Sequence, residues 1–205
     1  MTELSEAQES FERKIQLALK LSVPYSPRTL GQAVPEVDTP AAVLILFAWE
    51  KGKPRLLLTK RTEFVETHKG QYAFPGGRIE DNDRSSILAA LRETEEEVGV
   101  PLIAVRVLGE LPGLRTPTGY WITPVIGFLN RVLEQTPLKM SAEETAEAFW
   151  VDFGEFSQEG VYSCERFELG SGSFPVHVYQ LGDRRIWGVT GAMLKNLLDR
   201  LAEVG

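Results

Sequence analysis

The sequence has little of what cross-links a chain or carries it through a membrane. Its 205 residues contain one cysteine, Cys164, which excludes an internal disulfide and a zinc site built from cysteines. This usage is typical of a reducing compartment. The most apolar run, Ala41 to Trp49, has the length of a strand and falls well short of the roughly 20 residues that a membrane span needs.

An export signal is also lacking. The segment from Met1 to Phe11 is acidic and polar, whereas a secretory signal is basic and then apolar. We therefore expect a cytoplasmic protein with no membrane partner.

Positive charge is scarce as well. The chain has 22 Lys and Arg residues against 29 Asp and Glu residues, a net charge of −7. Binding to a long nucleic-acid backbone rests on clustered Lys and Arg, so we expect no nucleic-acid partner. A small anionic substrate stays compatible with this charge if metal ions neutralise it.

The N-terminal part predicts a helix and an irregular segment. Ser5 with Gln8 resembles a capping box, and apolar residues recur at helical spacing through residues 5–21. Four prolines and no periodicity follow between residues 22 and 40. We expect residues 1–40 to pack on a main domain formed by residues 41–205.

The main domain shows strands before and after one helix. Two β-compatible runs, 41–49 and 55–60, are separated by polar residues and predict a hairpin. The turn Phe74-Pro75-Gly76-Gly77 precedes a helix at about 85–98 that Gly99 ends. Further strands are expected at 105–111, 120–129, 146–152 and 176–181, with a closing helix at 190–204. This order predicts an α/β fold of α/β/α layers, with the N-terminal helix as an extension.

The helix at 85–98 carries the most informative residues. At about 100° per residue, Glu96 and Glu97 lie about 60° and 40° to either side of Glu93, so three carboxylates share one arc. Like charges at these spacings cost a few tenths of a kcal/mol per pair, which bound divalent cations would offset. The opposite face is expected to be a buried stripe of Ile87, Leu88, Leu91, Thr94 and Val98.

A plain acidic face is the alternative interpretation of this helix. The glycine turn upstream favours a metal site instead, because Gly76 and Gly77 let the backbone approach closely and let a carbonyl join the carboxylates.

Together these residues closely resemble the Nudix box. Its second half matches at Arg92, Glu93, Glu96, Glu97, Gly99 and Val100. Thr94 stands where an apolar residue is usual. In the first half Asp83 replaces a glutamate, and one extra residue precedes Arg92, which leaves the role of Asp83 open.

The resemblance implies a Nudix-type α/β/α sandwich with a mixed sheet. It also implies that Glu93, Glu96 and Glu97 bind Mg²⁺ or Mn²⁺ with the Gly76 carbonyl, and that Arg92 orients Glu93. Members of the family often place a further glutamate outside the box as a base or an additional ligand. Glu144, which precedes the strand at 146–152, resembles that position; an exposed loop glutamate is the alternative.

A second resemblance concerns the substrate. The residues 57–61, Gly70 and 74–77 are similar to the segment before the box in coenzyme A pyrophosphatases, although Glu66 stands where an arginine is usual. The longer spacing before Arg92 and the residues 187–191 share this likeness. Coenzyme A carries a pyrophosphate and a ribose 3′-phosphate, for which the segment offers cations and one aromatic ring. The candidate substrate-binding residues are Arg61, Lys69, Arg78 and Phe74.

The sequence therefore predicts a Mg²⁺-dependent pyrophosphohydrolase that cuts coenzyme A or acyl-CoA to adenosine 3′,5′-bisphosphate and 4′-phosphopantetheine or its acyl form. The alternative enzyme acts on ADP-ribose or another nucleoside diphosphate sugar. A non-catalytic nucleotide-sensing module ranks below both, because such domains often lose box glutamates that this chain keeps. The acyl preference, the number of metal ions and a homodimer stay open.

Overall fold

Three α-helices and two β-sheets make up the part of the chain that the computed structural model describes, which is residues 5–21, 38–62, 70–116, 118–131, 133, 136–169 and 172–205. The helices are α1 (Glu6–Lys20), α2 (Ser86–Val98) and α3 (Gly188–Glu203). Short 3₁₀ turns lie at Leu102–Ala104 and Phe153–Ser157. The strands are β1 (Thr39–Glu50), β2 (Lys53–Arg61), β3 (Tyr72–Ala73), β4 (Gly76–Arg78), β5 (Val105–Glu110), β6 (Leu114–Arg115), β7 (Tyr120–Leu129), β8 (Thr145–Asp152), β9 (Tyr162–Leu169), β10 (Gly172–Leu181) and β11 (Arg184–Ile186).

The larger sheet is mixed, as the sequence predicted. Its order is β3-β2-β1-β7-β5, with β4 beside β1, β6 beside β7 and β8 beside β2. β1 and β7 run parallel, whereas β1 and β2 form the predicted antiparallel hairpin. β8 pairs antiparallel with β2, so the end of β2 lies beside the start of β8, close to Glu144.

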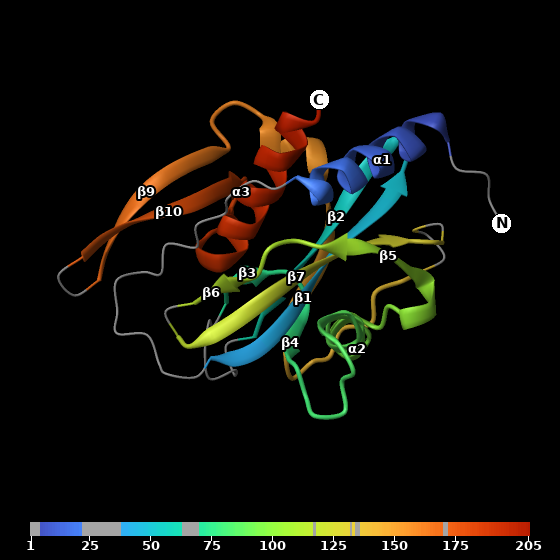
Figure 1. Ribbon diagram of the computed structural model, residues 1–205, viewed down its shortest axis with the longest axis horizontal. Helices are drawn as coiled ribbons and strands as arrows, with labels where there is room; N and C mark the ends of the chain where they lie inside the picture. Colours follow the sequence, from blue (N-terminus) through green and yellow to red (C-terminus); the bar gives the residue numbers. More distant parts are fainter. Residues whose placement is uncertain are drawn as a thin grey trace.

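Alternation along β1 divides the core into two layers. Leu44 and Leu46 pack with the apolar side of α2, whereas Ile45 and Phe47 pack with α1 and α3 on the other face. Figure 1 shows the same arrangement, with α2 below the sheet and α1 and α3 above it. The α/β/α prediction is therefore confirmed. No helix within the described ranges is long and apolar enough to cross a membrane.

Helix α1 begins as predicted but without a complete capping box. The Gln8 N–H donates to Ser5 Oγ at 3.2 Å, which caps the helix. The Gln8 side chain instead donates to Glu12 at 3.1 Å, and Glu12 pairs with Arg106 of β5. Ile15 and Ala18 are fully buried, so α1 packs firmly on the main domain.

Arg200 of α3 ties the end of α1 to the core. It is 2% exposed, and Nη1 donates to the carbonyls of Ala18 at 3.2 Å and Leu21 at 2.8 Å. We expect Arg200→Met to lower the free energy of unfolding by about 3 kcal/mol, because the buried Ala18 carbonyl and the half-buried Leu21 carbonyl lose this donor. Urea unfolding measures the change. Lys195→Met, which removes a partly exposed ion pair with Asp199, should cost about 1 kcal/mol or less; equal costs would contradict this role of Arg200.

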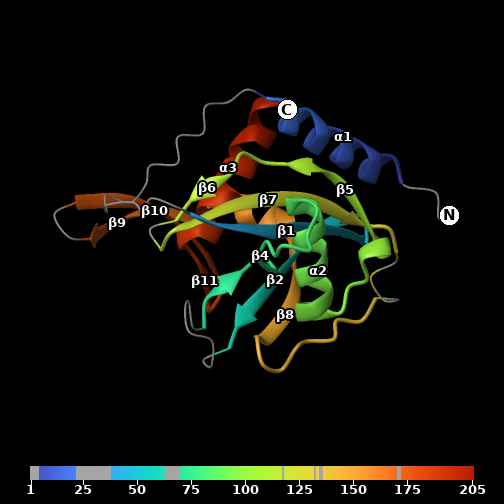
Figure 2. The same ribbon diagram turned by 60° about the horizontal axis from the view of Figure 1, so that its bottom comes forward.

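A second, three-stranded sheet, β11-β10-β9, was not predicted from the sequence. We expected one strand at 176–181, but β10 begins at Gly172 and pairs with β9 from Tyr162. This hairpin extends away from the body (Figures 1 and 2). The side chains of Ser163 to Phe167 are exposed, so β9 lacks the alternating burial that identifies a strand. The irregular segment expected before residue 40 lies, except for its last residues, outside the described part.

Candidate active site

Helix α2 is capped at both ends by the residues that flank it. Ser85 Oγ accepts from the Leu88 N–H at 3.2 Å, and Gly99 adopts the left-handed conformation with φ 72°. The predicted buried stripe needs one correction. Leu88 is 40% exposed, whereas Ala89 and Ala90, which the predicted stripe did not include, are fully buried.

Thr94 fits the buried face despite its hydroxyl. The residue is fully buried, and Oγ1 donates to the Ala90 carbonyl at 2.7 Å. The bond satisfies the polar atom within the helix, so a threonine replaces the usual apolar residue without an unpaired donor.

Three carboxylates meet beside α2. Glu93, Glu97 and Glu144 each offer an oxygen within 4.8 Å of the others. Glu97 is only 3% exposed, and Glu144 reaches the group from the loop before β8. Glu96, whose side chain is 59% exposed, lies outside this group. The sequence placed three box glutamates on one arc, but the structure brings two of them together with the glutamate outside the box.

The glycine turn before α2 lets the backbone approach these carboxylates. The Gly76 N–H donates to Glu97 Oε2 at 3.3 Å. A Cβ on Gly77 would lie 2.5 Å from the Glu93 carboxylate carbon, and a Cβ on Gly76 would lie 2.3 Å from the Ala42 carbonyl oxygen. The Ala42 carbonyl belongs to the backbone and Gly76 has φ 148°, so position 76 needs glycine, whereas a side chain at position 77 would require the Glu93 carboxylate to move.

Arg92 connects three acidic side chains. Its Nη1 lies 3.1 Å from Glu93 Oε1 and donates to Glu96 at 2.9 Å. Its Nε and Nη2 donate to the two oxygens of Asp83 at 3.2 and 2.9 Å. These bonds lower the pKa of Asp83 and raise that of Arg92. The role that the sequence left open for Asp83 is therefore to hold the guanidinium of Arg92.

We expect Asp83→Asn to lower turnover about tenfold, because asparagine has one acceptor oxygen where Arg92 donates to two, which leaves the position of Arg92 less defined. Steady-state kinetics at saturating metal measures the loss. Asp81 lies exposed in the same turn, so Asp81→Asn is the matched control and should keep full activity. Equal activity of the two variants would contradict the positioning role of Asp83.

Burial disfavours the ionised form of both α2 carboxyls in this cluster. Burial raises the pKa of Glu97 from its ordinary value of 4.5 to about 8, with smaller opposing effects from Arg61 and the Gly76 N–H. Burial also raises the pKa of Glu93, and the nearby charges of Glu96 and Glu144 add to the shift. Hard divalent cations take oxygen ligands of this kind, so the donor set fits Mg²⁺ or Mn²⁺.

The predicted substrate-binding residues lie at different places. Arg61 Nη1 is 3.8 Å from Glu97 Oε1, beside the carboxylates. Arg78 follows the glycine turn, and its guanidinium donates to the Tyr120 hydroxyl at 2.9 and 3.3 Å. Phe74 is 2% exposed within the apolar core, so its ring offers no face to a substrate. Lys69 lies outside the described residues.

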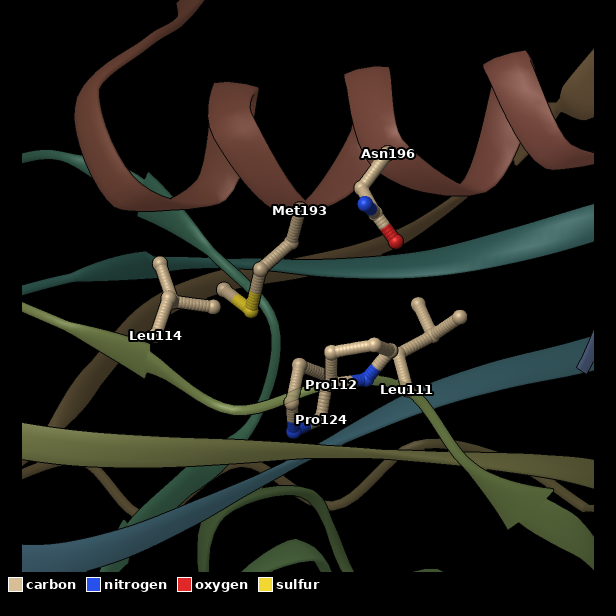
Figure 3. A pocket seen from close by; sticks show the side chains of 6 residues that line it. All are labelled: Leu111, Pro112, Leu114, Pro124, Met193 and Asn196. Atoms are coloured by element: carbon tan, nitrogen blue, oxygen red, sulfur yellow. The ribbon is translucent and has the colours of Figure 1, made fainter. Parts of the chain in front are cut away.

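A small apolar hollow lies on the other face of the sheet. Figure 3 shows Met193 and Asn196 of α3 above residues of β6, β7 and the segment before β6. Several of these residues belong to the core layer beneath α3, opposite α2. The hollow is therefore separate from the carboxylates and offers no charged group for a phosphate. Its lining is Leu111, Pro112, Leu114, Pro124, Met193 and Asn196.

Comparison with known proteins gives a consistent result. The family model of the NUDIX domain matches residues 38–166. The Nudix hydrolase NudL of Escherichia coli K12 is 36% identical over 168 residues, which cover 77% of this chain and 80% of that protein. The NudL protein of Shigella boydii serotype 4 is 37% identical over the same length. A solved structure of a MutT/nudix family protein from Enterococcus faecalis has a TM-score of 0.53 at 19% identity, covering 84% of this chain and 66% of that one.

The fold and the carboxylate helix thus define a hydrolase that acts on pyrophosphate linkages. The chain belongs to the Nudix family. Nudix hydrolases generally use divalent metal ions, and the acidic group beside α2 agrees with that property.

Proposed function

We propose that this Nudix hydrolase cuts the pyrophosphate of coenzyme A or acyl-CoA in the presence of Mg²⁺ or Mn²⁺. The products are adenosine 3′,5′-bisphosphate and 4′-phosphopantetheine or its acyl form. The observation that carries the chemistry is the meeting of Glu93, Glu97 and Glu144 within 4.8 Å beside the glycine turn. The likeness of residues 57–77 to coenzyme A pyrophosphatases supports the substrate.

In this proposal Glu93, Glu97 and Glu144 hold a divalent ion together with the Gly76 carbonyl. Glu96 remains a proposed ligand of a further ion, because it is exposed next to this group. An ion held there would supply Lewis-acid chemistry to the pyrophosphate and to the attacking water. Arg92 orients Glu93 and Glu96 through its bonds to both.

Cations near the carboxylates bind the substrate phosphates. Arg61 lies next to Glu97, and its partly exposed guanidinium can reach an oxygen of a phosphate that enters the group. Arg78 stands one residue beyond Gly77 and is fixed by Tyr120, so it is suited to a second phosphate. We retain Lys69 as a proposed partner of the 3′-phosphate on the basis of the sequence alone.

A second candidate is hydrolysis of ADP-ribose or another nucleoside diphosphate sugar. It is favoured by Glu66, which stands where coenzyme A pyrophosphatases usually have an arginine and reverses the charge offered to an anionic substrate. The chemistry at α2 would be the same, and only the groups that recognise the substrate would differ.

Product analysis separates the two candidates. Purified protein and Mg²⁺ are incubated with coenzyme A, ADP-ribose, NADH, UDP-glucose and diadenosine polyphosphates, and the products are identified by chromatography and mass. The proposal expects adenosine 3′,5′-bisphosphate and 4′-phosphopantetheine to form fastest. Faster cleavage of ADP-ribose or UDP-glucose would show that coenzyme A is not the preferred substrate, while the type of reaction would stay the same. If none of these compounds is cleaved, the proposed hydrolysis is wrong.

A further inference from the structure

Thr62 is hydrogen-bonded to the loop that carries Glu144. It follows the last residue of β2 and is 5% exposed. Its N–H donates to the Glu144 carbonyl at 3.0 Å, and its hydroxyl donates to the Glu143 carbonyl at 2.8 Å. Thr62 thus holds two consecutive carbonyls beside Glu144, one through its backbone N–H and one through its buried hydroxyl.

The same loop is fixed to α2 at its other end. The Ser141 N–H donates to the Glu97 carbonyl at 2.9 Å, and the Lys139 N–H donates to the Val98 carbonyl at 2.8 Å. These bonds use the free carbonyls at the C-terminal end of the helix. The loop therefore bridges the end of β2 and the end of α2, and Glu144 lies at the attachment to the end of β2.

The loop needs this support for two reasons. The pairing of β2 and β8 shifts its register between Lys60 and Arg61, so the regular ladder stops short of Glu144. Glu144 also lies within 4.8 Å of the carboxyl groups of Glu93 and Glu97, which repel it when they are ionised. Repulsion between these charges would move an unsupported loop outward.

We propose that Thr62 is a positioning residue, whose hydroxyl holds the 141–145 loop so that Glu144 completes the metal-binding carboxylate group. The inference rests on the proposed function, which assigns Glu144 to a divalent ion. Thr62 itself touches neither the ion nor the substrate. Removing its hydroxyl should therefore act only through Glu144.

Mn²⁺ binding to the full chain tests this, with free Mn²⁺ followed by electron paramagnetic resonance. Thr62→Val keeps the shape and removes the hydroxyl, and it should weaken Mn²⁺ binding about tenfold, as for other residues that orient a metal ligand. Thr62→Ser restores the donor and should restore most of the affinity. In a Glu144→Gln background, Thr62→Val should cause no further loss, because the residue it positions no longer binds.

Thr59→Val is the matched control. Thr59 lies in β2 and is buried like Thr62. Its hydroxyl donates at 3.3 Å to the Ala73 carbonyl of β3 rather than to the Glu144 loop. Thr59→Val should lower stability by an amount similar to that of Thr62→Val and leave Mn²⁺ binding unchanged. If Thr62→Val does not fold, as judged by circular dichroism, Thr62→Ala against Thr62→Ser gives the same comparison.

Equal Mn²⁺ affinity of Thr62→Val and wild type would overturn the inference. So would an undiminished effect of Thr62→Val in the Glu144→Gln background, or no effect of Glu144→Gln itself. These readouts need no substrate. Failure of the proposed hydrolysis would instead appear as unchanged pyrophosphates with the wild type, so the two failures are distinct.

Discussion

Glu97→Gln is expected to lower turnover about 10³-fold, the largest effect of any single substitution in this site. A bound ion supplies several kcal/mol of charge stabilisation in the transition state, and each 1.4 kcal/mol corresponds to about a factor of ten in rate. Glu97 is the most buried of the three grouped carboxylates and accepts from the Gly76 N–H. The amide keeps the size of the side chain and removes the negative charge that the ion requires.

Glu95→Gln is the control for this substitution. Glu95 lies on the same helix, is exposed and is not part of the carboxylate group. Its variant should keep wild-type turnover in steady-state kinetics at millimolar Mg²⁺. Turnover by Glu97→Gln within threefold of the wild type would remove Glu97 from the proposed catalytic residues.

The second large expected effect is that titration of Glu97 makes metal binding and the stability of the metal-free protein depend on pH. The pKa of Glu97 is raised from 4.5 to about 8, so its neutral form stabilises the metal-free protein. That stabilisation is complete below about pH 4.5 and is lost as the pH rises through about 8. The metal-free protein should therefore unfold at a lower temperature at pH 8.5 than at pH 5.5.

Divalent ions should counteract this loss of stability at high pH. An ion must displace the Glu97 proton, so its affinity should rise by up to about tenfold per pH unit between pH 6 and 8. Calorimetric titration with Mn²⁺ measures the affinity, and thermal unfolding measures the stability. In Glu97→Gln both pH dependences should be much weaker over this range. A wild-type affinity independent of pH between 6 and 8 would show that Glu97 is already ionised there.

The sequence was sufficient for the features that depend on local pattern. Helical spacing identified α1, α2 and α3, and the glycine at 99 ended α2 where expected. The arc calculation placed Glu93 and Glu97 on one side of α2, and the structure brings their oxygens together. These predictions succeeded because each depends on residues a few positions apart in the chain.

Features that depend on long-range contacts were not accessible in the same way. The proximity of Glu144 to α2 requires the loop between residues 138 and 145 to fold back on the helix end. Phe74 looked available in a glycine-rich turn, yet its ring packs in the core formed by distant elements. Thr62 gave no signal, because a threonine after a strand is ordinary until its carbonyl partners are known.

Asp83 departs from the motif and yet has a defined contact in the structure. Counting along the Nudix box left this residue without a role, since the side chain is shorter and the spacing is longer by one residue. In the structure both carboxylate oxygens accept from Arg92. The bonded partner lies 9 residues ahead, and only the turn before α2 reveals that the two side chains meet.

The most direct test of the proposed function is the ratio of kcat/KM for coenzyme A and for coenzyme A without its 3′-phosphate, measured with ADP-ribose in parallel. The two forms of coenzyme A share the pyrophosphate, so the ratio isolates recognition of the 3′-phosphate. A charge-assisted bond to this group is expected to favour coenzyme A by about tenfold or more. Equal values for the two forms, or a higher value for ADP-ribose, would contradict a site built for coenzyme A.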